Sequence, residues 1–209
     1  MQTSARPTEP GPGDDGPADL AAAEPGGSRR GTRGAIIDAT VPLIADRGFS
    51  ATSVDDIAAA AGVAKGSVYY NFGSKAALFE AVIVEGVNRL TVALRTASAG
   101  LTGRQAIGAL VHELLEQVQG HTAFAKLMVA EIFRTGRDWQ DSIRLVREES
   151  FAVFADVVRE SWPERDPSLT AATIFGATLV AGLEWLAFQP ERSVAEVRRA
   201  VLSTILDRL

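Results

Sequence analysis

The sequence predicts an all-α protein, in which a small N-terminal domain of three helices is extended by a longer helical bundle. Apolar residues recur at spacings of three and four after residue 28, and the strict alternation typical of strands is absent. Residues that end helices readily separate the periodic segments. These are Gly48, Gly62, Gly73, Gly100, Gly120 and Pro163. We expect helices near residues 33–47, 54–61, 65–72, 74–97, 103–119, 122–135, 138–161, 168–188 and 193–208.

The N-terminal segment differs from the rest of the chain. Residues 1–28 are rich in proline and glycine and contain few large apolar side chains. Such a segment cannot bury enough surface to offset its ordering entropy, so we expect a disordered tail. The first helix then presents one apolar face that includes Ile36 and Ile44. Pro42 removes a backbone donor inside this helix, but the apolar face continues across it, so we expect a single helix with a bend there.

Composition excludes several classes of site. The chain has no cysteine, so disulfides and thiolate metal sites are absent. The two histidines, His112 and His121, are nine residues apart, and we expect neither a metal nor a cofactor. The sequence shows no Ser-His-Asp arrangement, paired carboxylates or phosphate-cradling glycine loop. These observations argue against an enzyme.

Charge and hydropathy point to a cytoplasmic protein with a locally basic segment. The net charge is −5, but residues 28–80 carry six basic and five acidic groups, whereas the segments on either side are acidic. This is a weak signal for a nucleic-acid partner. Residues 171–188 are apolar and long, yet they include Glu184 and lack basic flanks, so we expect a bundle helix and no membrane partner. The N-terminus shows no apolar run, which favours the cytoplasm.

Residues 53–75 predict a helix-turn-helix. Ser53 can cap the second helix, and Asp56 three residues later completes a capping box. Gly62 can supply the left-handed residue that ends this helix. A new helix begins only about three residues later, at Lys65. Two short helices joined by such a turn form a helix-turn-helix, whose second helix can enter the major groove of DNA.

The second helix of this motif divides into a core face and an outer face. Val68 and Phe72 are four residues apart and point inward. Lys65 can donate to guanine, and a tyrosine ring can contact a thymine methyl group. Lys75 and Ser53 lie beside helix N-termini and suit phosphates. The residues expected at DNA are Ser53, Lys65, Gly66, Ser67, Tyr69, Tyr70, Asn71 and Lys75. Short helix pairs also occur as ordinary packing, so this pattern alone leaves both interpretations open.

The segment from about Arg33 to Ile83 resembles the DNA-binding domain of TetR-family regulators. The matching residues are Ile36, Ala39, Gly48, Phe49, Thr52, Val54, Ile57, Ala58, Ala61, Gly62, Val63, Gly66, Tyr69, Phe72, Ser74, Lys75 and Leu78. The resemblance implies a homodimer on a palindromic DNA operator, with an effector pocket and the dimer interface in the C-terminal helices. Most members of the family are repressors. Ala64 and Asn71 depart from the pattern, which often has Ser or Thr and His or Tyr there, so the base preference should differ.

This resemblance divides the chain into three parts: a tail over 1–28, a DNA-binding domain over 29–80, and a ligand-binding and dimerisation domain over 81–209. In the last part, Glu131 lies on an apolar stripe and needs a partner or a ligand, which favours a ligand with a cationic group. A salt bridge with Arg134 or Arg137 is the alternative. Candidate pocket residues are His112, Gln117, Phe124, Met128, Glu131, Trp139 and Phe151. Most of them also fit an ordinary core.

The last two helices are the candidate dimer interface, because both carry extensive apolar stripes that two protomers can join into a four-helix interface. The candidate residues are Gly176, Leu179, Gly182, Leu186, Val197, Val201 and Ile205. The hypothesis is therefore a repressor that a small apolar or amphipathic ligand releases from a palindromic operator. The alternative is a DNA-binding regulator without a small-molecule inducer, controlled by a protein partner or by its own abundance.

Overall fold

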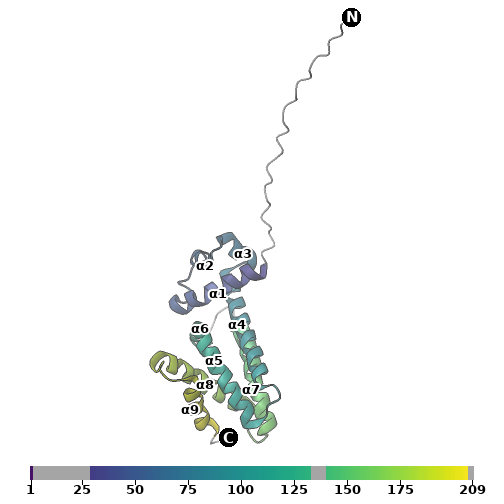
Figure 1. Ribbon diagram of the computed structural model, residues 1–209, viewed down its shortest axis with the longest axis vertical. Helices are drawn as coiled ribbons and strands as arrows, with labels where there is room; N and C mark the ends of the chain where they lie inside the picture. The colour runs from purple at the N-terminus through teal and green to yellow at the C-terminus, as the bar shows by residue number, and fades with distance from the viewer. Residues whose placement is uncertain (2–28, 133–139, 207–209) are drawn as a thin grey trace.

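The computed structural model describes Met1 and residues 29–132 and 140–206. Within these residues, the regular structure consists of α-helices, which confirms the predicted all-α class (Figure 1). The helices are α1 Arg29–Arg47, α2 Val54–Ala61, α3 Lys65–Phe72, α4 Lys75–Ser98, α5 Gly103–Gly120, α6 Thr122–Ile132, α7 Gln140–Ser161, α8 Pro167–Phe188 and α9 Val194–Leu206. Among the described residues, these bounds agree with the predicted ones to within a few residues, and the predicted ends at 135, 138 and 208 lie outside the described residues. Helix α1 continues through Pro42, as its apolar face predicts.

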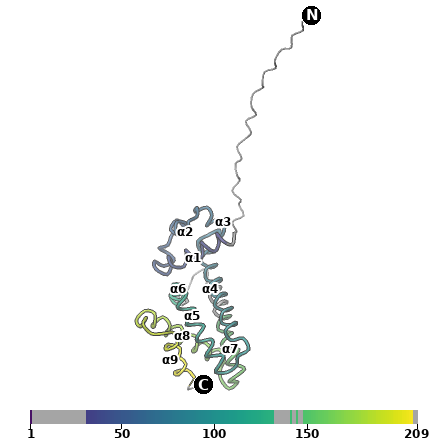
Figure 2. Tube along the Cα trace, viewed as in Figure 1, coloured from purple at the N-terminus to yellow at the C-terminus, as the bar shows by residue number. Residues whose placement is uncertain are grey.

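The helices form a small head and an elongated bundle. Figures 1 and 2 show α1, α2 and α3 together at one end of the described chain. Helix α4 leaves this head and runs along the bundle, where it packs against α5 and α7. Helix α8 lies against α5 and α7, and α9 lies against α5 and α8. Helix α6 returns to the head and packs against α1. Both α4 and α6 therefore connect the head to the bundle.

Two apolar cores correspond to these two parts. The core of the head contains buried side chains from α1 to α4, such as Ile36, Ile57 and Phe79, and it also includes Leu127 of α6. The core of the bundle extends from Leu94 of α4 to Val201 of α9. The core of the head includes Val82 and Ile83, so it continues along α4 past residue 80, where the sequence suggested a domain boundary.

Local signals explain where the helices begin and end. Ser53 caps α2, and Ser74 caps α4 by accepting a hydrogen bond from the Ala77 amide at 3.0 Å. Asp166 caps α8 by accepting from the Leu169 amide at 2.8 Å, and Pro167 follows at the first helical position. Each cap satisfies an amide that the helix itself leaves without an acceptor.

Helix α8 has the length and the apolar composition of a membrane span, but it belongs to the bundle. It packs against α5, α7 and α9. Of the most apolar 18-residue segment of α8, only 28% is buried within the protomer. Its outer side exposes Leu169, Val180 and Phe188, at 70%, 65% and 74% respectively. The expected bundle helix is therefore present, with an apolar face that the protomer itself does not cover.

Candidate DNA-binding surface and ligand cavity

The turn between α2 and α3 is short and closed by backbone hydrogen bonds. Gly62 adopts a left-handed conformation with φ 66°, which a side chain would disfavour. Its amide donates to the Ala59 carbonyl at 3.2 Å, and the Val63 amide donates to the Ala58 carbonyl at 3.0 Å. These bonds end α2 tightly, and α3 begins at Lys65. The sequence-predicted helix-turn-helix is therefore present.

Helix α3 is anchored by one face and exposed on the other. Val68 is buried in the core of the head. The Cζ atom of Arg33 lies 4.4 Å from the centroid of the Phe72 ring, over its face. The outer face carries exposed Lys65, Gly66, Tyr69 and Tyr70, as the sequence predicts for a groove-facing helix. Ser67 on the same helix is half-buried. The N-cap residue Ala64 makes no side-chain hydrogen bond, so this helix lacks the side-chain cap that α2 and α4 have.

Asn71 is engaged within its own helix. Its side-chain amide donates to the Ser67 carbonyl at 2.7 Å, and its backbone carbonyl accepts from Arg33 Nη1 at 3.1 Å. The residue is half-buried. The hydrogen bond to Ser67 uses one N–H of the amide and holds the side chain against its own helix, so Asn71 differs from the four exposed residues of α3.

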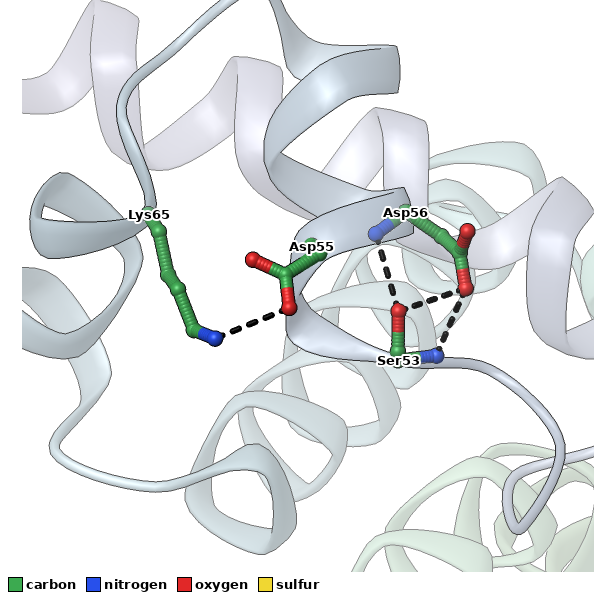
Figure 3. A network of polar contacts seen from close by, with 4 residues as sticks. All are labelled: Ser53, Asp55, Asp56 and Lys65. Atoms are coloured by element: carbon green, nitrogen blue, oxygen red, sulfur yellow. Dashed lines mark hydrogen bonds and ion pairs between the residues drawn. The ribbon is translucent and has the colours of Figure 1, made fainter.

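Ser53 is committed to the cap of α2 (Figure 3). The Ser53 amide and hydroxyl both donate hydrogen bonds to Asp56 Oδ2, at 3.0 and 2.6 Å respectively. The Ser53 hydroxyl in turn accepts a hydrogen bond from the Asp56 amide at 3.0 Å. The Ser53 hydrogen bonds lower the pKa of Asp56 below its ordinary value. A phosphate at Ser53 would have to compete with this carboxylate. The expected phosphate contact by Ser53 is therefore disfavoured by the geometry.

Lys75 and Lys65 are also placed by contacts within the head. The Lys75 ammonium lies 4.3 Å from the centroid of the Phe49 ring, at the start of α4. Lys65 Nζ lies 2.8 Å from Asp55 Oδ2 (Figure 3). This hydrogen bond raises the pKa of Lys65. Asp55 is absent from the set predicted by sequence, because ten residues and a turn separate it from Lys65.

A cavity of about 1240 Å³ lies among α1, α4, α5, α6, α7 and α8. Four of the predicted pocket residues line it: Gln117, Phe124, Met128 and Phe151. His112 does not. It is exposed on α5, where Nε2 lies 3.9 Å from Glu116 Oε1. Glu131 is buried at 3% exposure but is not among the lining residues. Trp139 lies outside the described residues.

The cavity wall combines an apolar body with a few polar groups that sequence reasoning missed. Leu90, Val118, Phe175 and Leu179 contribute apolar surface from three helices. Arg89 and Arg144 contribute guanidinium groups, Asp38 and Asp141 contribute carboxylates, and Ser150 contributes a hydroxyl. The Ser150 hydroxyl lies 2.9 Å from that of Thr91, in a buried contact between α7 and α4. Such a cavity suits an amphipathic ligand.

The cavity reaches the head directly. Ile37, Val41 and Pro42 of α1 line it, together with Phe124 of α6 and Gly86 of α4. The Phe124 ring lies so close to Gly86 that a Cβ there would be 2.2 Å from Cζ. A molecule in the cavity would therefore contact α1 of the head and both helices, α4 and α6, that connect the head to the bundle.

The predicted interface residues lie mostly within the protomer. Gly182 is buried, and a Cβ there would lie 3.1 Å from Val118 Cγ1 and 3.2 Å from Leu115 Cδ2. Val197 and Val201 belong to the bundle core, where α9 packs on α5. Leu179, Leu186 and Ile205 are partly buried against that core, and Gly176 and Leu179 line the cavity. Because their burial is explained within one chain, the exposed side of α8 is the better candidate for a partner.

Comparison with known proteins relates the chain to bacterial regulators. The family model "Bacterial regulatory proteins, tetR family" matches residues 36–82. The chain is 31% identical over 140 residues to the transcriptional repressor KstR2 of Rhodococcus jostii, covering 64% of this chain and 63% of the relative. It is 30% identical over 145 residues to the transcriptional activator FasR of Mycolicibacterium smegmatis, covering 65% and 66%. Each alignment thus spans slightly less than two thirds of the curated relative.

The fold is also similar to that of a solved regulator. The transcriptional regulator FadR from Bacillus subtilis, in complex with stearoyl-CoA, superposes with a TM-score of 0.73 at 19% identity. The superposition covers 84% of this chain and 98% of that one. At this identity the likeness shows a common fold.

Proposed function

Because the chain belongs to the TetR family of bacterial regulatory proteins, we propose that it is a dimeric transcriptional regulator that binds a palindromic operator. The observation that carries this proposal is the outer face of α3, where Lys65, Gly66, Tyr69 and Tyr70 are exposed on a helix anchored by Val68. Helix-turn-helix proteins place this helix in the major groove. Membership of the family also agrees with the expectation that the chain is not an enzyme.

The proposal is tested by binding to genomic DNA fragments. A twofold dimer should protect two half-sites whose centres are about one helical turn apart, or a multiple of it. Affinity should fall as the salt concentration rises, because contacts with phosphates release counterions. A reporter gene placed behind the protected site then measures the sign of regulation. We propose repression, as in the Rhodococcus jostii relative, although the Mycolicibacterium smegmatis relative is an activator.

We also propose that the cavity binds an amphipathic effector with a long apolar part. Its size supports this proposal, since a cavity of about 1240 Å³ exceeds typical drug-sized sites of roughly 300–1000 Å³. A regulator of the same fold binds stearoyl-CoA. Because Glu131 is not among the lining residues, its carboxylate gives no support to a cationic effector in this cavity. The alternative of a regulator without a small-molecule inducer is disfavoured by the cavity.

The effector would act on DNA binding through the helices that line the cavity. Helix α4 carries Lys75 at its start and Gly86 in the cavity wall, and α1 contributes Ile37 and Val41 to that wall. A ligand that prefers one arrangement of these helices shifts the dimer toward that arrangement. The expected consequence is a changed separation of the two α3 helices, and hence release of the operator.

Titration of the operator complex with stearoyl-CoA and with dodecyltrimethylammonium tests both the cavity and the charge of the ligand. The matched variant is Gly176→Leu, because Gly176 lines the cavity and a Cβ there has no neighbour within 4 Å. This variant should bind the operator like the parent protein but should resist release. Equal release of both proteins would place the effector elsewhere. If instead the cationic probe releases the operator from the parent protein but not from Glu131→Gln, the Glu131 carboxylate recognises a cationic ligand as the sequence predicts.

A further inference from the structure

The DNA-facing edge of the head carries an ion pair that the helix-turn-helix itself does not need. Lys65 Nζ and Asp55 Oδ2 lie 2.8 Å apart, and their side chains are 52% and 66% exposed (Figure 3). Lys65 is the first residue of α3. In helix-turn-helix proteins, the N-terminal residues of the second helix contact base edges. A carboxylate bonded to the Lys65 ammonium therefore lies at the same edge.

Asp55 lies in the first turn of α2, where an acid suits the helix dipole, but it takes no part in the capping box. The adjacent Asp56 makes the capping box with Ser53 and uses Oδ2 for both the amide and the hydroxyl of that residue. Asp55 Oδ2 instead accepts a hydrogen bond from Lys65 Nζ, across the turn. On a surface that approaches DNA, a carboxylate is repelled by phosphates, so its presence weakens binding that does not depend on sequence. A compensating contact with bases would explain its position.

The donor and acceptor of this pair match the major-groove edge of one base pair. Guanine presents two acceptors, N7 and O6, and cytosine presents the N4 amino donor. An ammonium donates to guanine, and an aspartate accepts from cytosine N4. Guanine O6 and cytosine N4 are joined by a Watson–Crick hydrogen bond of about 2.9 Å. The Lys65–Asp55 separation of 2.8 Å is similar, so the pair can face both bases without parting.

We propose that Lys65 and Asp55 together read one G·C base pair in each half of the operator, with Lys65 on guanine and Asp55 on the cytosine amino group. This proposal rests on the proposed function. The other base pairs fit less well, because A·T places a donor between two acceptors. Read in the opposite direction, T·A also presents an acceptor beside a donor, thymine O4 and adenine N6, but the ammonium then finds one acceptor and a neighbouring methyl group in place of the two acceptors of guanine. Asp55 is thus a specificity-determining residue rather than a source of affinity.

Selection of bound duplexes from a random library tests this assignment. Three proteins are compared: the parent, Asp55→Asn and the matched control Asp56→Asn, which removes the same charge one residue away. The parent should select a palindrome with a fixed G·C pair at equivalent positions of both half-sites. Asp55→Asn should lose about tenfold of the preference for that pair over the other pairs. It should also bind random duplexes more tightly, because a negative charge has gone.

The control variant Asp56→Asn and the selected sequences distinguish a failure of base readout by Asp55 from a failure of DNA binding itself. Asp56→Asn should lower the stability of the head and leave the selected sequence unchanged. If Asp55→Asn selects the same sequence with the same preference as the parent, Asp55 does not read bases and the inference is overturned. If the fixed G·C pair is absent from the parent's palindrome, the inference also fails. If the parent selects nothing at low salt, the proposed function itself fails.

Discussion

Lysine side chains on the outer side of the head are held by neighbours before any DNA is bound. Lys65 lies on Asp55, and Lys75 lies over the ring of Phe49. Lys75 and Phe49 are both half-buried, where a cation–π contact is worth about 0.5–2 kcal/mol, so it orients Lys75 without fixing it. Both ammonium groups remain available to a stronger acceptor. Their proposed roles differ, because phosphate contacts carry no sequence information whereas base contacts do.

Alanine substitutions should separate these roles. Lys75→Ala should weaken binding to operator and random duplexes by the same factor, because it removes a phosphate contact. Lys65→Ala and Tyr69→Ala should in addition reduce discrimination at one position by about 1–3 kcal/mol. Fluorescence anisotropy at fixed salt measures both affinities. Equal losses on operator and random DNA for all three variants would remove Lys65 and Tyr69 from base readout.

The capping carboxylate of α2 predicts a pH-dependent stability. Hydrogen bonds from Ser53 lower the pKa of Asp56 in the folded protein, below its ordinary value of 3.8. The contribution of the Asp56 carboxylate to the stability of the folded protein is therefore fully present above pH 3.8 and is lost as the pH falls through the lowered pKa. Urea unfolding of the parent and of Asp56→Asn should show a stability difference at neutral pH that disappears in acid. A difference independent of pH would show that the charge of Asp56 does not contribute.

At the scale of helices, the ends of elements could be predicted from sequence because their causes are local. Ser53, Gly62 and Ser74 each act within a few residues of the chain, and each ends or begins a helix in the structure. The Lys65–Asp55 pair could not be predicted in this way, since it depends on how two helices are placed by the turn. The same holds for Phe124 and Gly86, which are brought together from α6 and α4.

The orientation of α8 and α9 also lay beyond sequence reasoning. Periodicity identifies an apolar stripe but not the surface that covers it. Val197 and Val201 form the predicted stripe of α9, and the structure places it against α5 of the same protomer. Helix α8 is apolar around most of its circumference, so Gly182 and Val180 were equally suitable for an interface by sequence. The structure distinguishes them, since Gly182 is buried and Val180 is 65% exposed.

The contact between α4 and α6 gives a prediction at this scale. Alanine favours helices over glycine by about 1 kcal/mol, so Gly86→Ala would stabilise α4 if space allowed. A Cβ at this position would instead lie 2.2 Å from the Phe124 ring. Gly86→Ala should therefore destabilise the protein by about 1–3 kcal/mol, because the ring must move.

Thermal unfolding measures this effect against a matched control. Gly34→Ala lies in α1, where a Cβ meets nothing within 4 Å, and it should be neutral or stabilising. In the Phe124→Ala background, the penalty of Gly86→Ala should disappear, since the two changes act at one contact. Additive effects in the double variant would show that α4 and α6 do not meet as described.

For the whole molecule, we propose that a second copy covers the exposed side of α8. Leu169, Val180 and Phe188 lie on it and are largely exposed in one protomer. A twofold axis beside this helix would bury the same apolar face of both copies. It would also leave the head, with α3, at the opposite end of the bundle available to DNA (Figure 1).

Val180→Arg should therefore produce a monomer that keeps its helical content and loses operator binding. Val92→Arg is the matched control, because Val92 is exposed to a similar extent, at 64%, on α4. It should remain a dimer. Gly182→Arg should unfold the bundle instead, since Val118 and Leu115 occupy the space around it. Sedimentation velocity with circular dichroism distinguishes these outcomes, and an intact Val180→Arg dimer would place the interface on another surface.

Footprinting on genomic DNA, with and without an amphipathic ligand, tests whether this chain regulates transcription by binding DNA through α3. We expect protection of a palindrome whose half-sites lie on one face of the duplex, because one dimer presents two copies of α3. Protection should weaken with salt and disappear when the ligand fills the cavity. Absence of any protected palindrome at low salt would contradict the claim that this chain regulates transcription by binding DNA through α3.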